Sequence, residues 1–154
     1  MNKNYQLDDI DKKILNLLQE DSRMPFLEIA RECGISGAAI HQRFQKLLND
    51  GLVIGSEILV DPIKIGYSTC AFIGIFLEKA SMFSEVVEEL KKIPEVVECH
   101  YTTGNYSIFI KVFTHDNNHL KEVLAEKLQS IKGISRTETL ISLEQSFKRY
   151  LPVT

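Results

Sequence analysis

The spacing of apolar residues changes along the chain, and this change limits the folds that the chain can adopt more than any other feature. Up to about residue 50, apolar side chains recur every three or four positions, which is typical of helices that bury one face. From residue 52 onward, strand-like segments lie between segments that keep the helical spacing. The sequence therefore predicts a helical part and a mixed part of the α+β class, joined by a linker.

Three short helices are predicted in the first part. An apolar repeat that begins at Ile10 marks one face of the first helix, and similar repeats mark helices over 26–33 and 37–50. Gly34 can adopt the left-handed backbone of a turn, and Ser36 is a natural N-cap. Two short helices around a glycine-containing turn are typical of a helix-turn-helix.

The third predicted helix has an outer face that suits DNA. No acidic residue lies between Ser36 and Asn49, although residues 1–62 contain seven Lys or Arg and ten Asp or Glu, and the whole chain has a net charge of −3. Any basic surface must therefore be local. Polar and basic side chains on this face can contact base edges or phosphates. The alternative interpretation is a simple helical hairpin whose outer face is exposed to solvent and binds no DNA. The residues expected at DNA are Ser36, Gly37, Ala38, His41, Gln42, Arg43 and Lys46.

The second part is predicted to be a ferredoxin-like domain with the element order βαββαβ. Strands are expected at 68–78, 96–103, 106–114 and 135–143, and helices at 82–93 and 117–131. The segment 52–60 is also strand-like and would give the helix-turn-helix a wing. The expected domains are a winged helix-turn-helix domain over 1–60, a linker over 61–67 and a ferredoxin-like domain over 68–154.

Both faces of the predicted sheet are apolar. In the first strand Ile73 and Ile75 alternate with Phe72 and Phe76, yet the two helices can cover only one face. The other face should meet a second sheet, most simply that of an identical chain. We therefore expect a homo-oligomer.

Residues 101–112, "YTTGNYSIFIKV", predict two strands joined by a tight turn at Gly104 and Asn105. The predicted tip has uncharged hydrogen-bonding side chains, which suit a small polar ligand. The alternative is a hairpin that packs against a neighbouring chain without a ligand. The tip residues are Tyr101, Thr102, Thr103, Gly104, Asn105, Tyr106 and Ser107.

Three motifs, in order, resemble the Lrp/AsnC family, the feast/famine regulators of amino-acid metabolism. They are "LDDIDKKIL" near the start, Ser36-x-x-x-Ile40-x-x-Arg43-x-x-Lys46-Leu47 followed by "DGLVIG", and the "TTG-x-Y" hairpin. The resemblance covers almost the whole chain. It implies a DNA-binding transcriptional regulator with no cofactor, built from homodimers that assemble further, commonly into octamers.

The resemblance also implies that a free amino acid binds between dimers at the hairpin tip. The site would be completed by Glu122, Val123, Leu124, Ala125 and Glu126 of the second helix and by Thr137, Glu138, Thr139, Leu140 and Ile141 of the last strand. The segments "TTGNYSIFIKV" and "TETLISL" are most similar to the asparagine-responsive branch. A tip without side-chain charge also favours asparagine, with glutamine next.

Two positions depart from the family pattern. Ala39 stands where Thr is common, which removes a hydroxyl near the helix start and bears on DNA affinity or site preference. Asn105 stands where many members have Asp, which makes a cationic effector less suitable.

Other classes of protein fit the sequence less well. An enzyme would need a nucleophile with a base, a phosphate loop or a metal set, and none of these patterns occurs; a catalyst would also leave the first fifty residues unexplained. The other alternative is a sensor or interaction module without DNA binding, but this chain has a predicted DNA-binding domain. Three widely spaced cysteines predict neither a disulfide framework nor a zinc site, and no metal site is expected at His115 and His119. No secretory signal or bilayer-spanning segment is expected, so the predicted location is the cytoplasm.

Overall fold

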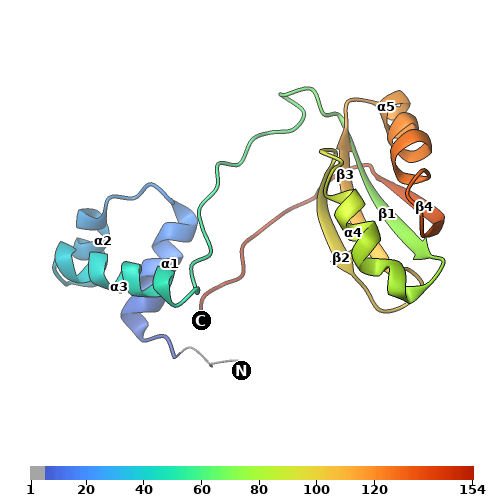
Figure 1. Ribbon diagram of the computed structural model, residues 1–154. Helices are drawn as coiled ribbons and strands as arrows, with labels where there is room; N and C mark the ends of the chain where they lie inside the picture. The colour runs from blue at the N-terminus through green and yellow to red at the C-terminus, as the bar shows by residue number, and fades with distance from the viewer. Residues whose placement is uncertain (1–5) are drawn as a thin grey trace. The chain divides into compact units, whose positions relative to one another are not determined.

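The computed structural model describes residues 6–154, and contacts divide the chain into two compact units. The first unit contains the chain up to Leu59 together with Phe147–Thr154, and the second contains Val60–Ser146 (Figure 1). The first boundary lies close to the expected linker. The C-terminal segment Phe147–Thr154, expected in the ferredoxin-like domain, contacts the helical unit instead.

The first unit contains the three expected helices, α1 (Asp9–Glu20), α2 (Phe26–Cys33) and α3 (Gly37–Asn49). Gly34 ends α2 with a left-handed backbone (φ 68°), and the Ser36 hydroxyl accepts a hydrogen bond from the Ala39 amide at the start of α3. A small apolar core joins the helices, and its buried members are Ile14, Ile29, Ala30 and Ile40. The helix-turn-helix prediction is confirmed.

The expected wing strand over 52–60 does not form in the structure. This segment is extended but pairs with no described strand, and Ile54 and Ile58 are 97% and 75% exposed. A strand needs a partner for its backbone groups as well as a suitable sequence, and the described residues of this chain supply none here.

The second unit is a four-stranded antiparallel sheet with helices on one face. The strands β1 (Thr69–Leu77), β2 (Val96–Tyr101), β3 (Ile108–Thr114) and β4 (Ile134–Ser142) lie in the order β2-β3-β1-β4. A short 3₁₀ turn, η1 (Ala80–Met82), leads into α4 (Phe83–Leu90), and α5 (Asn117–Glu122) continues as a π-helix, η2 (Val123–Leu128). The element order is the expected βαββαβ.

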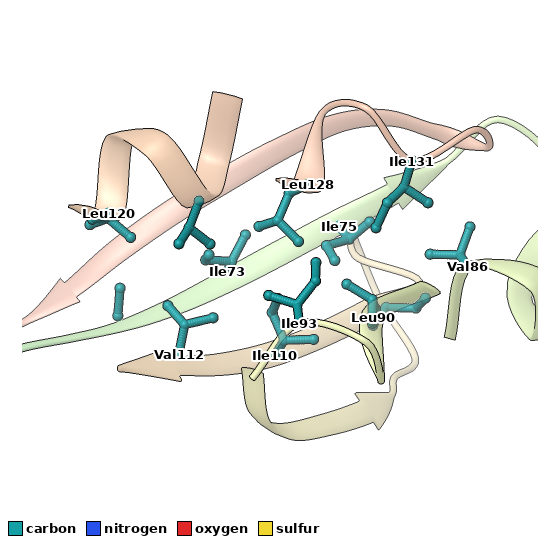
Figure 2. Close-up of a cluster of buried hydrophobic side chains, with 13 residues drawn as sticks. Ile73, Ile75, Val86, Leu90, Ile93, Ile110, Val112, Leu120, Leu128 and Ile131 are labelled. Carbon is teal, nitrogen blue, oxygen red and sulfur yellow. The ribbon is translucent and has the colours of Figure 1, made fainter. Parts of the chain in front are cut away.

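The core of the second unit lies between these helices and one face of the sheet (Figure 2). The inward side chains of β1 and β3 alternate with outward ones, as predicted: Ile73, Ile75, Ile108 and Ile110 are fully buried. Val86 and Leu90 from α4, with Leu120 and Leu128 from α5 and η2, pack against them. The opposite face of the sheet has none of this unit's helices over it.

Two elements differ in detail from the sequence-based prediction. The β2–β3 connection is longer than a two-residue turn: β2 ends at Tyr101, β3 begins at Ile108, and the Thr102 amide donates to the Ser107 carbonyl. Gly104 has a positive φ but Asn105 does not, so these two residues do not form a type I′ turn. The helix expected over 117–131 changes from α to π within its length, and the Gln129 amide donates to the Leu124 carbonyl five residues before it.

Candidate DNA-binding and ligand-binding sites

The outer face of α3 is open along its length. Ala38, His41, Gln42 and Lys46 are exposed, and Gln42 and Lys46 form no hydrogen bond or ion pair with the described residues. His41 contacts the edge of Phe26 at 5.9 Å between ring centroids, which limits how its ring can turn. Gly37 is partly buried and lies next to the Ser36 cap.

Arg43 has a different environment from the other predicted DNA-binding residues. Its Nη1 atom lies 2.6 Å from Asp8 Oδ2 and 2.8 Å from Asp11 Oδ1, so the guanidinium joins α3 to the start of α1. Hydrogen bonds to Asp8 and then Asp11 raise the pKa of Arg43. At Asp8, the backbone N–H of Asp11 and then Arg43 lower the pKa of the carboxyl group. The structure thus gives Arg43 a structural role inside the helix-turn-helix.

Some polar side chains of the hairpin tip are hydrogen-bonded within the chain, and others have no described partner. The Thr102 hydroxyl donates to the Tyr106 carbonyl at 2.8 Å, which closes the loop. The side chains of Thr103, Asn105 and Ser107 form no hydrogen bond with the described residues. These three side chains are therefore the open polar groups of the tip.

Tyr106 connects the tip to the last strand. Its hydroxyl donates to Glu138 Oε2 at 2.8 Å, and this bond raises the pKa of Tyr106. Its ring lies so close to Gly74 that a Cβ atom there would be 2.4 Å from the ring. Arg136 forms an ion pair with Glu138 at 3.2 Å. A carboxylate and a guanidinium therefore lie beside a tip that has no charged side chain of its own.

The predicted β4 residues are divided between the two faces of the sheet. Directly paired residues of antiparallel strands point to the same side, and β4 pairs Leu140 with Phe72 and Glu138 with Gly74. Glu138 and Leu140 therefore share the helix-free face with Tyr106. The remaining β4 residues, Thr137, Thr139 and Ile141, pair with the inward-facing Ile75, Ile73 and Ala71.

The predicted helical part of the site makes no described side-chain contact with the tip. In α5 and η2, Val123 is buried in the core and Leu124 packs against it, while Glu122, Ala125 and Glu126 are exposed. None of these side chains has a described contact with the tip. A cavity of about 370 Å³ lies where the end of η2 meets the start of β4, lined by Gln129, Ile134, Ser135, Arg136 and Thr137.

The helix-free face of the sheet is aromatic. Phe72 stacks on Phe109 at 5.8 Å between ring centroids, and Phe76 meets Tyr106 edge to face at 5.3 Å. The Lys111 ammonium lies 5.9 Å from the Phe72 centroid, and the Arg136 guanidinium 4.0 Å from that of Phe76. All four rings remain partly exposed.

A buried polar network lies outside the predicted sites. Glu95, only 8% exposed, pairs with Lys127 and His119. Sequence reasoning missed it because Glu95 stands alone between Pro94 and two valines, and only the fold brings these side chains together. Within residues 6–154, no group of three metal-ligating side chains could hold a metal ion, and no helix is long and apolar enough to cross a membrane.

Both units match known protein families. Residues 7–48 match the AsnC-type helix-turn-helix domain, and residues 70–152 match the Lrp/AsnC ligand binding domain. The chain is 44% identical over 145 residues to the regulatory protein AsnC of Haemophilus influenzae, covering 94% of this chain and 97% of that one. The regulatory protein AsnC of Escherichia coli is 40% identical over 146 residues, covering 95% and 96%.

Solved structures give the same result for the fold. The structure of E. coli AsnC matches with a TM-score of 0.92 and 38% identity, covering 96% of this chain and 99% of that one. A transcriptional regulator of Neisseria meningitidis in complex with L-methionine matches with a TM-score of 0.89 and 26% identity, covering 94% of each chain. The named relatives are regulators and not enzymes, and the chain is a DNA-binding transcriptional regulator that belongs to the Lrp/AsnC family.

Proposed function

We propose that this regulator contacts its operator through the exposed face of α3 and binds asparagine at the hairpin tip. The single observation that supports the ligand is the set of open polar side chains of Thr103, Asn105 and Ser107. Two hydroxyls and one carboxamide can satisfy another carboxamide, whereas an aliphatic side chain placed against them would leave polar groups unpaired, at about 1–3 kcal/mol each.

The charged groups beside the tip are compatible with this ligand. Glu138 and Arg136 pair with each other, so together they add no net charge. An amino acid has a positive and a negative end, and the backbone around Gly104, where no other atom lies near the missing Cβ, leaves room for them. At the tip, a lysine or glutamate ligand would bring an additional charge that the paired Glu138 and Arg136 do not neutralise.

We further propose that two chains pair through the helix-free sheet face and that such dimers assemble into an octamer. The aromatic face supports the first step, because Phe72, Phe76 and Phe109 are only half-buried in the single chain. The lack of any described side-chain contact between the tip and residues 122–126 supports the second. Because these segments do not meet within one chain, a ligand site that uses both needs the helical segment from a neighbouring chain.

On the DNA side, Gln42 and His41 are proposed to contact bases, and Lys46 a phosphate. Ser36, Gly37 and Ala38 would allow close approach at the helix start. Arg43 would act mainly by holding α3 in place, because its guanidinium already pairs with Asp8 and Asp11.

Calorimetry with asparagine, glutamine, leucine and methionine tests the ligand. Wild-type protein should release or absorb heat with asparagine. The nearly isosteric Thr103→Val variant should lose affinity for asparagine, by about tenfold if one hydrogen bond of roughly 1.4 kcal/mol is lost. Binding of leucine or methionine without asparagine would contradict the proposed ligand. A mobility-shift assay with DNA from upstream of the protein's own gene, with and without asparagine, tests whether the protein binds DNA and whether asparagine changes that binding.

A further inference from the structure

The end of the linker is held to the ligand-binding unit by one histidine. His115 Nδ1 lies 2.8 Å from the Gly66 carbonyl, and because a carbonyl only accepts, this nitrogen carries the proton. The Tyr67 ring stacks on the His115 ring at 4.3 Å between centroids. Both the Ser68 amide and its hydroxyl donate to the His115 carbonyl. The segment that leads from the expected linker into β1 is therefore clamped to residue 115.

A second histidine connects this clamp to the buried carboxylate. His119 stacks on His115 at 5.0 Å, and its Nδ1 accepts a hydrogen bond from the His115 amide. Neutral His119 must then carry its proton on Nε2, which lies 3.1 Å from Glu95 Oε1. Asp116, the other charged group here, caps α5 by accepting from the His119 amide.

The same Glu95 oxygen also accepts from the π-helical segment. Lys127 Nζ lies 2.6 Å from Glu95 Oε1, so Lys127 and His119 meet at one atom. Desolvation acts to raise the pKa of Glu95, but the hydrogen bond from Lys127, a backbone hydrogen bond and the hydrogen bond from His119, together with the charge of Lys127, lower it. The second oxygen, Oε2, is buried and has no partner among the described residues. A buried unpaired acceptor makes this arrangement costly to hold and sensitive to the position of Lys127.

The π-helix sets that position. His119 and Lys127 are eight positions apart, and a straight α-helix, which turns roughly 100° per residue, would place them about 80° out of line. A π-helix closes its turns five residues apart and so turns less per residue, which brings the two side chains toward one face. The hydrogen bond from the Gln129 amide to the Leu124 carbonyl has this wider spacing.

We propose that Lys127, Glu95, His119 and His115 connect the π-helical segment to the end of the linker, so that a ligand bound against residues 122–126 changes how firmly the linker is held. The inference rests on the proposed ligand site, because those residues are its helical part. The two states differ in the register of Val123–Leu128: in the π register Lys127 reaches Glu95, and in an α register it turns away. A ligand shifts this equilibrium only by binding the two registers with different affinity.

Amide hydrogen exchange on the full-length protein tests the connection without any ligand. Lys127→Met and Glu95→Gln should speed exchange at the Gly66, Tyr67 and Ser68 amides by about tenfold relative to wild type. Lys121→Met is the matched control, because Lys121 is exposed on the same helix and has no described partner. Amides of Ile73 and Ile110 in the core strands report global stability. The proposal would be overturned if exchange at the linker amides were unchanged in the variants, or if exchange at the linker and core amides were accelerated equally.

Saturating asparagine tests whether ligand binding changes how firmly the linker is held. Exchange at Tyr67 and Ser68 should change on addition of asparagine to wild type and should not change further in Lys127→Met. Asparagine that binds by calorimetry but leaves the linker amides of wild type unchanged would refute the connection while leaving the proposed function intact. If none of the twenty amino acids binds, the proposed ligand binding is wrong, and so is the proposed effect of the ligand on the linker.

Discussion

Arg43 and Lys46 show how two basic residues of one helix can have separate roles. The Lys46 ammonium is free of described partners, whereas the Arg43 guanidinium pairs with Asp8 and Asp11. Lys46→Ala should weaken binding to all DNA sequences alike and reduce the salt slope by about one unit. Arg43→Ala should mainly lower the midpoint of thermal unfolding of the helical unit, because α3 loses its link to α1. Mobility shifts over a salt series and calorimetric melting separate the two effects; equal loss of DNA binding with unchanged melting in both variants would contradict this division.

The Glu95 carboxylate should give the protein a characteristic acid sensitivity. Its pKa is lowered in the folded state, so its contribution to the free energy of unfolding is present above the unfolded pKa of about 4.3 and is lost as the pH falls through the folded pKa. Glu95→Gln should therefore flatten the fall in stability at acid pH. Lys127→Met should cost about 1–3 kcal/mol at neutral pH, because it leaves a buried carboxylate short of a partner. Urea unfolding between pH 3 and 7 measures both; a Glu95→Gln curve parallel to wild type would refute the assignment.

At the scale of elements, Gly104 tests the ligand-binding tip. Its φ of 104° is rarely adopted by other residues, and no atom lies within 4 Å of where its Cβ would be. Gly104→Val should therefore act through backbone strain in the loop and through the bulk it adds at the proposed ligand site. Asparagine binding should disappear while DNA binding without asparagine persists. Calorimetry and a mobility shift give the two readings, and retained asparagine binding would show that the ligand lies elsewhere.

The C-terminal segment is an element that sequence patterns did not reveal. The Asn16 side chain donates to the Val153 carbonyl at 3.1 Å and accepts from the Val153 amide, and Gln19 donates to the Leu151 carbonyl. Asn16→Ala should release this segment and speed its trimming by carboxypeptidase several-fold, whereas Asn16→Asp keeps one of the two bonds and should have a smaller effect. Identical trimming of wild type and Asn16→Ala would show that these bonds do not hold the segment.

Sequence predicted the elements whose signal lies within one segment and missed those that depend on distant partners. The period of apolar residues gave the three helices, the βαββαβ order and the buried face of the sheet, because burial of a helix or strand face leaves a local repeat. The apolar pattern over 52–60 suggested a strand that has no partner among the described residues. Nothing local distinguishes the π-helical residues 123–128 from an α-helix, or pairs Arg43 with Asp8, since both depend on packing across the fold.

At the scale of the whole molecule, the second apolar sheet face remains a prediction about assembly. The alternation of side chains along β1 places Phe72 and Phe76 on the same face, and none of the second unit's own helices packs on that face. Their rings are partly shielded by neighbours such as Phe109 and Lys111, which reduces but does not remove the apolar surface. The Tyr106 hydroxyl donates to Glu138, which lies on this face, so the proposed assembly surface and the proposed ligand site share residues.

Phe72→Glu should therefore separate the chains. The new carboxylate would be buried between two sheets, at a cost of several kcal/mol unless it is protonated or escapes to water, while in a single chain it remains partly exposed beside Lys111. Lys121→Glu introduces the same side chain on the exposed surface of α5 and should leave assembly unchanged. Sedimentation at micromolar concentration should show an even-numbered oligomer for wild type and the control, and monomers or aggregates for Phe72→Glu. A monomeric wild-type chain at that concentration would show that the aromatic face does not pair with a second copy, because a face that buries three phenylalanine rings per chain should remain associated at that dilution.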